Sequence, residues 1–93
     1  MDIKKNFTHN ILQIANALSE CGIPFSLNTI SDGMQIQFPW IGADIVCHSF
    51  SYGSEFDRVE SMGFPWDKGD VTSMKVDTAI RLVKILYKLR NAR

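Results

Sequence analysis

Two amphipathic segments, one at each end of the chain, constrain the fold more than any other feature of this sequence. The apolar side chains of residues 3–21 recur at helical spacing: Phe7, Ile11, Ile14, Ala15 and Leu18. Gly22 and Pro24 follow, and they end a helix because glycine adopts the left-handed conformation and proline cannot continue the helix. Residues 75–90 carry a similar stripe, with Asp77 near the start and basic residues at the end, as the helix dipole favours. The sequence therefore predicts two long helices, each of which needs an apolar surface to cover.

Three strands are predicted directly after the first helix. Residues 25–30 and 34–38 alternate apolar with polar side chains, and the Asp32-Gly33 pair between them is favoured in tight hairpin turns. Residues 44–50 are rich in β-formers and make the third strand. The three strands together indicate an antiparallel meander.

The facing of residues 44–50 is ambiguous, because both alternate sets of side chains contain apolar residues. We expect Ile45 and Cys47 to point inward, and the exposure of His48 is left open. Successive side chains of a strand point to opposite faces, so Cys47 and His48 cannot form a nucleophile–base pair directly. The sequence contains no other catalytic constellation, and we expect no catalytic residue, no cofactor and no enzymatic activity.

Residues 51–71 have the least regular pattern. Ser54 is placed to cap a short helix over residues 55–62, which Gly63 would close. Residues 64–70 are expected to form a loop. The predicted fold is an α+β two-layer sandwich in the order α-β-β-β-short α-α. In it, the three-stranded antiparallel meander is covered on one face by the N- and C-terminal helices.

Composition fits a single domain over residues 1–93. The chain is 45% hydrophobic, and a chain of this length buries roughly 60–65% of its unfolded surface, enough for a core without disulfides or a metal. Cys21 and Cys47 have no paired spacing of the zinc-site type, and no apolar run approaches the ~20 residues that cross a bilayer. We expect a reduced, cytoplasmic protein without a membrane partner.

Charge is distributed unevenly, although the formal net charge is zero. Residues 24–73 carry seven acidic and two basic side chains, a net charge of −5, whereas residues 74–93 carry six basic and one acidic, a net charge of +5. Arg81, Lys84 and Lys88 lie near one side of the predicted C-terminal helix and are the candidates for phosphate contacts. A solvated helix face is the favoured interpretation, because the neutral total charge lacks the basic signature of nucleic-acid-binding domains.

A Phe-Pro-Trp tripeptide occurs twice, at residues 38–40 and 64–66. The first copy ends a predicted strand, and packing of Trp40 over the end of the core explains it. The second copy stands among polar residues, where tryptophan is favoured as an interface anchor. The predicted binding residues belong to this aromatic and acidic stretch: Tyr52, Phe64, Trp66, Asp67 and Asp70. The two aspartates lack the spacing of a calcium loop, so no metal site is predicted.

A resemblance to a group of proteins rests on two segments: Ser49-Phe50-Ser51-Tyr52-Gly53 and Met62-Gly63-Phe64-Pro65-Trp66-Asp67-Lys68-Gly69-Asp70-Val71. They resemble small uncharacterised proteins of phages and prophages of Gram-positive bacteria. Those proteins are similar in size and carry comparable Ser-Tyr-Gly and Trp-Asp-x-Gly-Asp-Val arrangements before a final helix. The resemblance implies a small accessory protein in the host cytoplasm, and it implies neither an activity nor a functional residue.

These observations predict a small non-enzymatic accessory protein that binds a protein partner, or a second copy of itself as a homodimer, through the aromatic-rich stretch 51–71. The alternative is a nucleic-acid-associated regulator that uses the basic C-terminal helix. A small enzyme of unspecified type ranks third.

Overall fold

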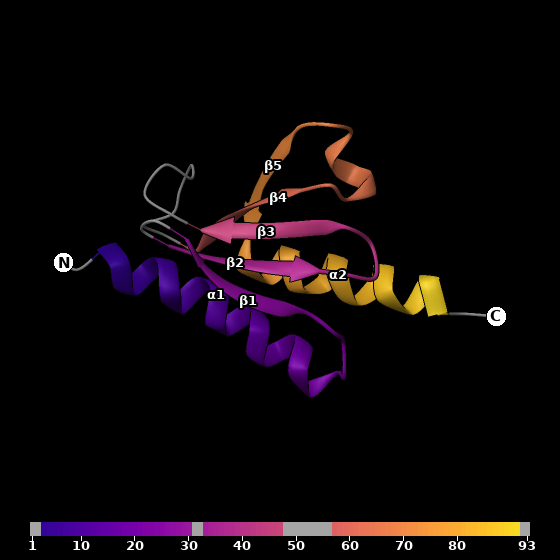
Figure 1. Ribbon diagram of the computed structural model, residues 1–93, viewed down its shortest axis with the longest axis horizontal. Helices are drawn as coiled ribbons and strands as arrows, with labels where there is room; N and C mark the ends of the chain where they lie inside the picture. Colours follow the sequence, from indigo (N-terminus) through magenta and orange to yellow (C-terminus); the bar gives the residue numbers. More distant parts are fainter. Residues whose placement is uncertain (1–2, 31–32, 48–56, 92–93) are drawn as a thin grey trace.

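The computed structural model of the chain describes residues 3–30, 33–47 and 57–91 (Figure 1). Its elements in chain order are α1 (Ile3–Glu20), β1 (Ser26–Ile30), β2 (Gly33–Phe38), β3 (Ala43–Cys47), β4 (Arg58–Met62), the 3-10 helix η1 (Pro65–Asp67), β5 (Val71–Lys75) and α2 (Val76–Asn91). Neither of the two long helices described is long and apolar enough to cross a membrane.

The five strands form one antiparallel sheet in the order of the sequence, from β1 to β5. Ile36 in the second strand lies between Leu27 of β1 and Ile45 of β3. Helix α1 packs on β2 and β3, α2 packs on β4 and β5, and the two helices pack against each other. Both helices therefore cover the same face of the sheet, and the predicted α+β architecture with two helices on the sheet is confirmed.

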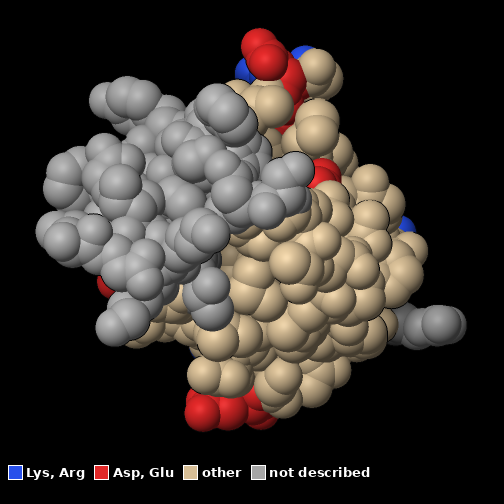
Figure 2. Space-filling model, turned by 60° about the vertical axis from the view of Figure 1, so that its left-hand side comes forward, with Lys and Arg blue, Asp and Glu red and all other residues tan. Residues whose placement is uncertain are grey.

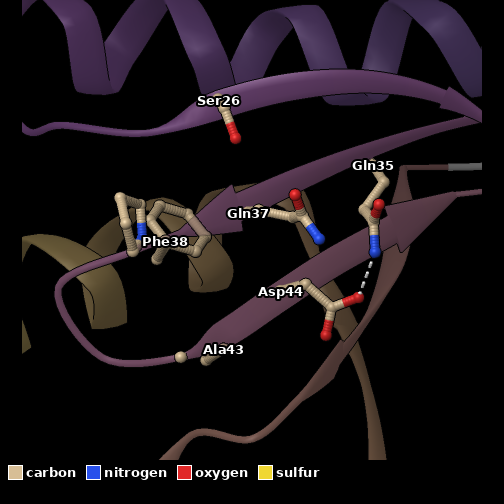
Figure 3. Close-up of a pocket in the computed structure, with 8 residues that line it drawn as sticks. Ser26, Gln35, Gln37, Phe38, Ala43 and Asp44 are labelled. Carbon is tan, nitrogen blue, oxygen red and sulfur yellow. Dashed lines mark hydrogen bonds between the residues drawn. The ribbon is translucent and has the colours of Figure 1, made fainter.

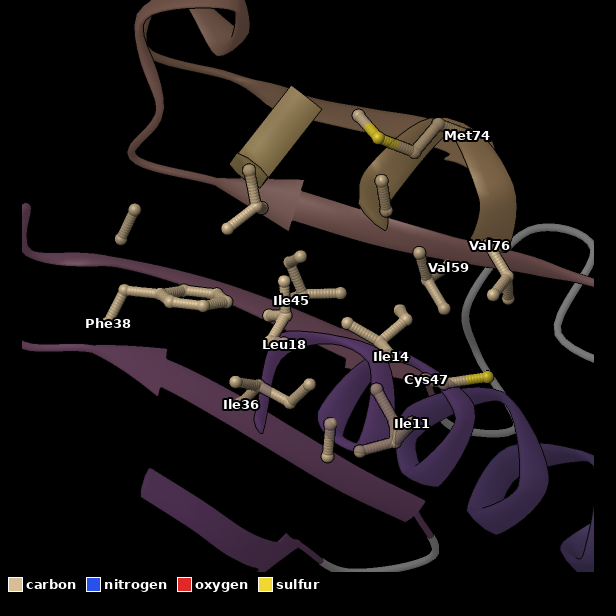
Figure 4. Packing of buried hydrophobic residues seen from close by; sticks show 14 of the residues in the cluster. Ile11, Ile14, Leu18, Ile36, Phe38, Ile45, Cys47, Val59, Met74 and Val76 are labelled. Carbon is tan, nitrogen blue, oxygen red and sulfur yellow. The ribbon is translucent and has the colours of Figure 1, made fainter. Parts of the chain in front are cut away.

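The core lies between this face of the sheet and the helices. Figure 4 shows side chains of α1 pointing toward those of the inner strands, and the residues labelled there are almost fully buried: Ile11, Ile14, Leu18, Ile36, Phe38, Ile45, Cys47, Val59, Met74 and Val76. Ile45 and Cys47 are both 0% exposed, whereas the alternate residues Asp44 and Val46 are half-buried. The predicted inward facing of Ile45 and Cys47 is therefore correct, and His48 lies outside the described residues.

The predicted number of strands is wrong, because the sheet has five strands rather than three. Residues 58–62, expected in a short helix, form β4, and β5 follows the hairpin loop. Ser54 and the start of the predicted helix lie outside the described residues. Each of the two additional strands sends one large apolar side chain into the core: Val59 from β4 and Met74 from β5. The alternation in their sequences is correspondingly weak.

The first Phe-Pro-Trp copy closes the end of the β2–β3 hairpin, as predicted. The backbone N–H of Gly42 donates to the carbonyl of Phe38 at 2.9 Å, which makes the turn after β2. Trp40 Nε1 donates to the carbonyl of Pro24 at 2.8 Å. The indole also packs edge-on against Tyr87 of α2, with ring centroids 5.0 Å apart. Trp40 thus joins the β2–β3 turn to the α1–β1 connection and to α2.

The two Phe-Pro-Trp copies meet through their phenylalanine rings. Phe38 and Phe64 lie edge to face with centroids 5.5 Å apart, and Trp66 stacks on Phe64 at 4.5 Å and 7°. Because Phe38 also contacts Trp40 at 5.8 Å, the rings form a continuous series, here called the aromatic row: Tyr87, Trp40, Phe38, Phe64 and Trp66. Aromatic pairs in such geometries stabilise a fold beyond the area they bury. The aromatic row explains the repeated tripeptide by packing.

Candidate interaction surfaces

Asp67, a predicted binding residue, lies inside the fold and is only 4% exposed. Its Oδ1 accepts a hydrogen bond from Ser61 Oγ at 2.7 Å, and its Oδ2 accepts one from the backbone N–H of Phe64 at 2.9 Å. Trp66 Nε1 donates to the same Ser61 oxygen at 3.0 Å. The carboxylate therefore holds the chain that enters η1, as aspartates commonly do in turns.

The other predicted binding residues differ in exposure. Phe64 is 3% exposed, Trp66 is half-buried, and Asp70 is exposed. The Asp70 carboxylate accepts a hydrogen bond from the next backbone N–H at 2.8 Å. Tyr52 lies outside the described residues. The hairpin loop between β4 and β5 thus brings Phe64, Trp66 and Asp67 together. Of the predicted binding residues that the structure describes, only Asp70 and part of Trp66 are open to solvent.

The exposed basic residues and the exposed apolar residues of helix α2 lie in two adjacent sectors of the helix surface. Arg81, Lys84 and Lys88 are exposed and lie within one sector of the helix, as predicted from their spacing. Ile85 and Leu89 are 50% and 67% exposed and occupy the neighbouring sector. Nothing in the described chain covers either sector, and this helix therefore has both a basic and an apolar exposed surface.

Among the hollows on the surface of the described chain, two have linings that bear on function. One, of about 490 Å³, lies where the end of α1 meets α2 and is lined by Cys21, Ile23, Lys84, Tyr87, Lys88 and Asn91. The other, of about 420 Å³, lies on the sheet face that the helices leave uncovered (Figure 3). There Gln35 Nε2 donates to Asp44 Oδ2 at 2.7 Å. Asp44 is the one charged residue in its lining, so this hollow offers hydrogen-bonding amides rather than an acid–base pair.

Reactive chemistry has little support among the described residues. They contain no group of three or more His, Cys, Asp or Glu residues that could hold a metal ion. Burial raises the pKa of the Cys47 thiol from 9.0 to about 11. The hydrogen bond from Asn10 lowers this pKa and the charge of Glu60 raises it, both less strongly than burial. The thiol is therefore protonated at neutral pH, whereas a nucleophilic cysteine needs the thiolate.

Strand β1 forms an open edge of the sheet. It pairs with β2 in unbroken register from Ser26 to Ile30, and no other described strand pairs with it. Its five residues, Ser-Leu-Asn-Thr-Ile, include no charged residue and no proline. Proteins usually protect such edges with lysine, proline or a bulge. The opposite edge strand, β5, ends in Lys75 and continues directly into α2.

Apolar side chains lie on the helix side of this open edge. Leu27 is 40% exposed and pairs with the buried Ile36, so it points toward the helix layer. Leu12 of α1 is 39% exposed. Asn10, about 200° away around the helix, donates to the carbonyl of Arg58 at 3.3 Å. Leu12 therefore projects away from β4, on the side of α1 nearer to β1.

Charge is sparse on one broad surface of the molecule. In the view of Figure 2, the charged side chains lie at the margins of a wide uncharged area. Such a surface suits contact with protein better than contact with a polyanion, because phosphate binding depends on clustered lysine and arginine.

Comparisons of the chain with protein-family models, with curated proteins and with solved structures gave no match in any of the three. The resemblance to small phage and prophage proteins remains a prediction.

The sequence contained a signal for the open edge that the prediction did not use. The absence of charge and proline in residues 26–30 is visible in the sequence. Its importance depends on which edges of the sheet stay open. The predicted meander has edges at residues 25–30 and 44–50, and the pairing of β3 with β4 covers the second of them.

Proposed function

We propose that this protein is a non-enzymatic interaction module that binds an extended protein segment by strand addition to β1. The observation that carries the proposal is the uncharged, regular and unprotected edge of this strand. In strand addition, backbone hydrogen bonds supply affinity and alternate side chains supply specificity. Leu27 and Leu12 provide an apolar surface for one set of those side chains.

The proposed class of function is the predicted one, a non-enzymatic interaction protein. The proposed binding surface is the edge of β1 instead of residues 51–71. The stretch 51–71 was expected to bind through its aromatic residues, but Phe64 and Asp67 are used by the fold. Trp66 donates its indole N–H to Ser61 and stacks on Phe64. A binding role for Trp66 and Asp70 stays a prediction, which a folded Trp66→Ala protein that retains its partner would remove.

Selection from a library of extended random peptides tests the proposal. Asn28 lies in the middle of β1, and Asn28→Lys places a charge on the edge, which should abolish binding of the selected peptides. Val71→Lys places the same charge on the opposite edge strand, at a residue that is 45% exposed, and should leave binding intact. Peptides that bind both variants equally well would contradict strand addition to β1.

Nucleic-acid binding through α2 is the second candidate, and the exposed sector of Arg81, Lys84 and Lys88 favours it. The two candidates differ in their response to salt. Phosphate contacts predict an affinity that falls steeply as salt is raised, whereas strand addition predicts a shallow response. A steep response that Lys84→Gln and Lys88→Gln abolish would favour this second candidate.

A further inference from the structure

We propose that the occupant of the β1 edge is the β1 strand of a second copy of this chain, paired antiparallel about a two-fold axis at Asn28. This inference rests on the proposed function and names the partner of the same edge. Antiparallel pairing centred there places Asn28 opposite its own copy, Leu27 opposite Thr29, and Ser26 opposite Ile30. The two sheets then join into one ten-stranded sheet with all four helices on one face.

Charge is the first reason for a second copy. At a two-fold axis an edge strand pairs with its own copy, so like charges on the edge are brought close together and repel each other. Residues 26–30 contain no charged side chain. The formal net charge of the whole chain is also zero, so two copies do not repel each other at long range near neutral pH.

Asn28 is the second reason. Its amide carries two donor hydrogens and an acceptor oxygen, and one hydrogen bonds Gln37 Oε1 at 2.8 Å. The remaining donor and acceptor suit an identical amide directly opposite. Two asparagine amides that face each other across the axis can therefore each donate one hydrogen bond and accept one, and neither amide carries a charge.

The helix side of the edge is the third reason. Leu27 and Leu12 are each about two-fifths exposed in the single chain. The two-fold axis places Leu27 of each copy opposite Thr29 of the other, on the side of the new strand pair that carries the helices, and Leu12 lies on that same side. The pairing thus covers part of the exposed Leu27 side chain.

Sedimentation velocity over a concentration series tests the inference. A five-residue strand pair with four leucines makes a small interface, so we expect dimerisation between about 10 µM and about 1 mM. Asn28→Lys and Asn28→Glu should each be monomeric, because like charges then meet at the axis. A mixture of the two should form a heterodimer, since opposite charges face each other. Val71→Lys, on the opposite edge strand, should dimerise like the wild type.

Three results would overturn the inference. One is a wild-type protein that stays monomeric throughout the concentration series. Another is an Asn28→Lys protein that dimerises as the wild type does, which would place the interface elsewhere. The third is a mixture of the Lys and Glu variants that does not associate, although both variants keep the circular dichroism of the wild type. Peptide selection remains a separate test, so a monomeric wild type that still binds extended peptides at β1 refutes the second copy and retains strand addition.

Discussion

At the scale of the residue, the second Phe-Pro-Trp stretch illustrates how a polar, aromatic sequence can serve the fold. Asp67 begins the polar run Asp-Lys-Gly-Asp in the sequence, yet it is buried and accepts hydrogen bonds from Ser61 and from the Phe64 backbone. Its polarity suggested a solvated loop, and only the tertiary structure shows that its carboxylate is turned inward. Trp66, which the sequence placed on a binding surface, shares the same network.

Replacing Asp67 by asparagine should destabilise the protein by about 1–3 kcal/mol, because the amide supplies one acceptor oxygen where the fold uses two. With the amide nitrogen turned toward Ser61, the Ser61 hydroxyl loses its acceptor, and with the nitrogen turned toward Phe64, two N–H donors face each other. Asp70→Asn is the matched control, since Asp70 is exposed and bonds the backbone through a single oxygen. Urea denaturation of both variants measures the effect, and equal midpoints for the two would contradict a structural role for Asp67.

Cys47 gives a prediction about pH. The folded thiol has a pKa of about 11, raised from 9.0 by burial, so between these values the unfolded chain releases its proton while the folded chain keeps it. The contribution to stability is complete below about pH 9 and is lost as the pH rises through this window. Compared with Cys47→Ala, the wild type should lose about 2 kcal/mol more across the window. Parallel stability–pH curves for the two proteins would contradict this account.

At the scale of the element, the sequence was sufficient for the helices and the first hairpin. Their signals are dense: α1 buries Ile11, Ile14 and Leu18 on one side, and β2 alternates buried with polar residues. β4 and β5 were missed because Ser61 and Thr72 occupy inward positions, leaving Val59 and Met74 as isolated apolar signals. Gly63 suggested a helix end, whereas it lies directly after a strand.

Gly63 holds the β4 end close to the β2–β3 turn. Its φ is +89°, and a Cβ there would lie 3.1 Å from Ala43 Cα and 3.1 Å from the Gly42 carbonyl oxygen. Gly63→Ala should therefore cost about 2–4 kcal/mol from backbone strain and overpacking together. Gly69→Ala has a similar φ, +83°, with no atom within 4 Å of the new Cβ, and should cost about 1–2 kcal/mol. Thermal unfolding measures the stability of the two variants, and equal losses of stability would contradict the close contact of Gly63 with the β2–β3 turn.

At the scale of the whole molecule, the sheet is asymmetric in the protection of its edges. β5 ends in a lysine and continues into α2, whereas β1 is uncharged and carries the partly exposed Leu27. The sequence predicted a protein-binding module and named a homodimer among its forms. It did not locate the surface, because the predicted meander has two edges, at residues 25–30 and at residues 44–50. Only the pairing of β3 with the unrecognised β4 shows that the second of these edges is covered.

The most direct test of the open edge is a dilution series of the isotope-labelled protein followed by amide NMR, from about 1 mM to about 10 µM, a range that brackets weak interfaces. Pairing of two copies at β1 predicts concentration-dependent shifts concentrated in residues 26–30 and at Leu12, with β5 unchanged. Shifts confined to α2 or to the hairpin loop, or no shifts at any concentration, would contradict this pairing.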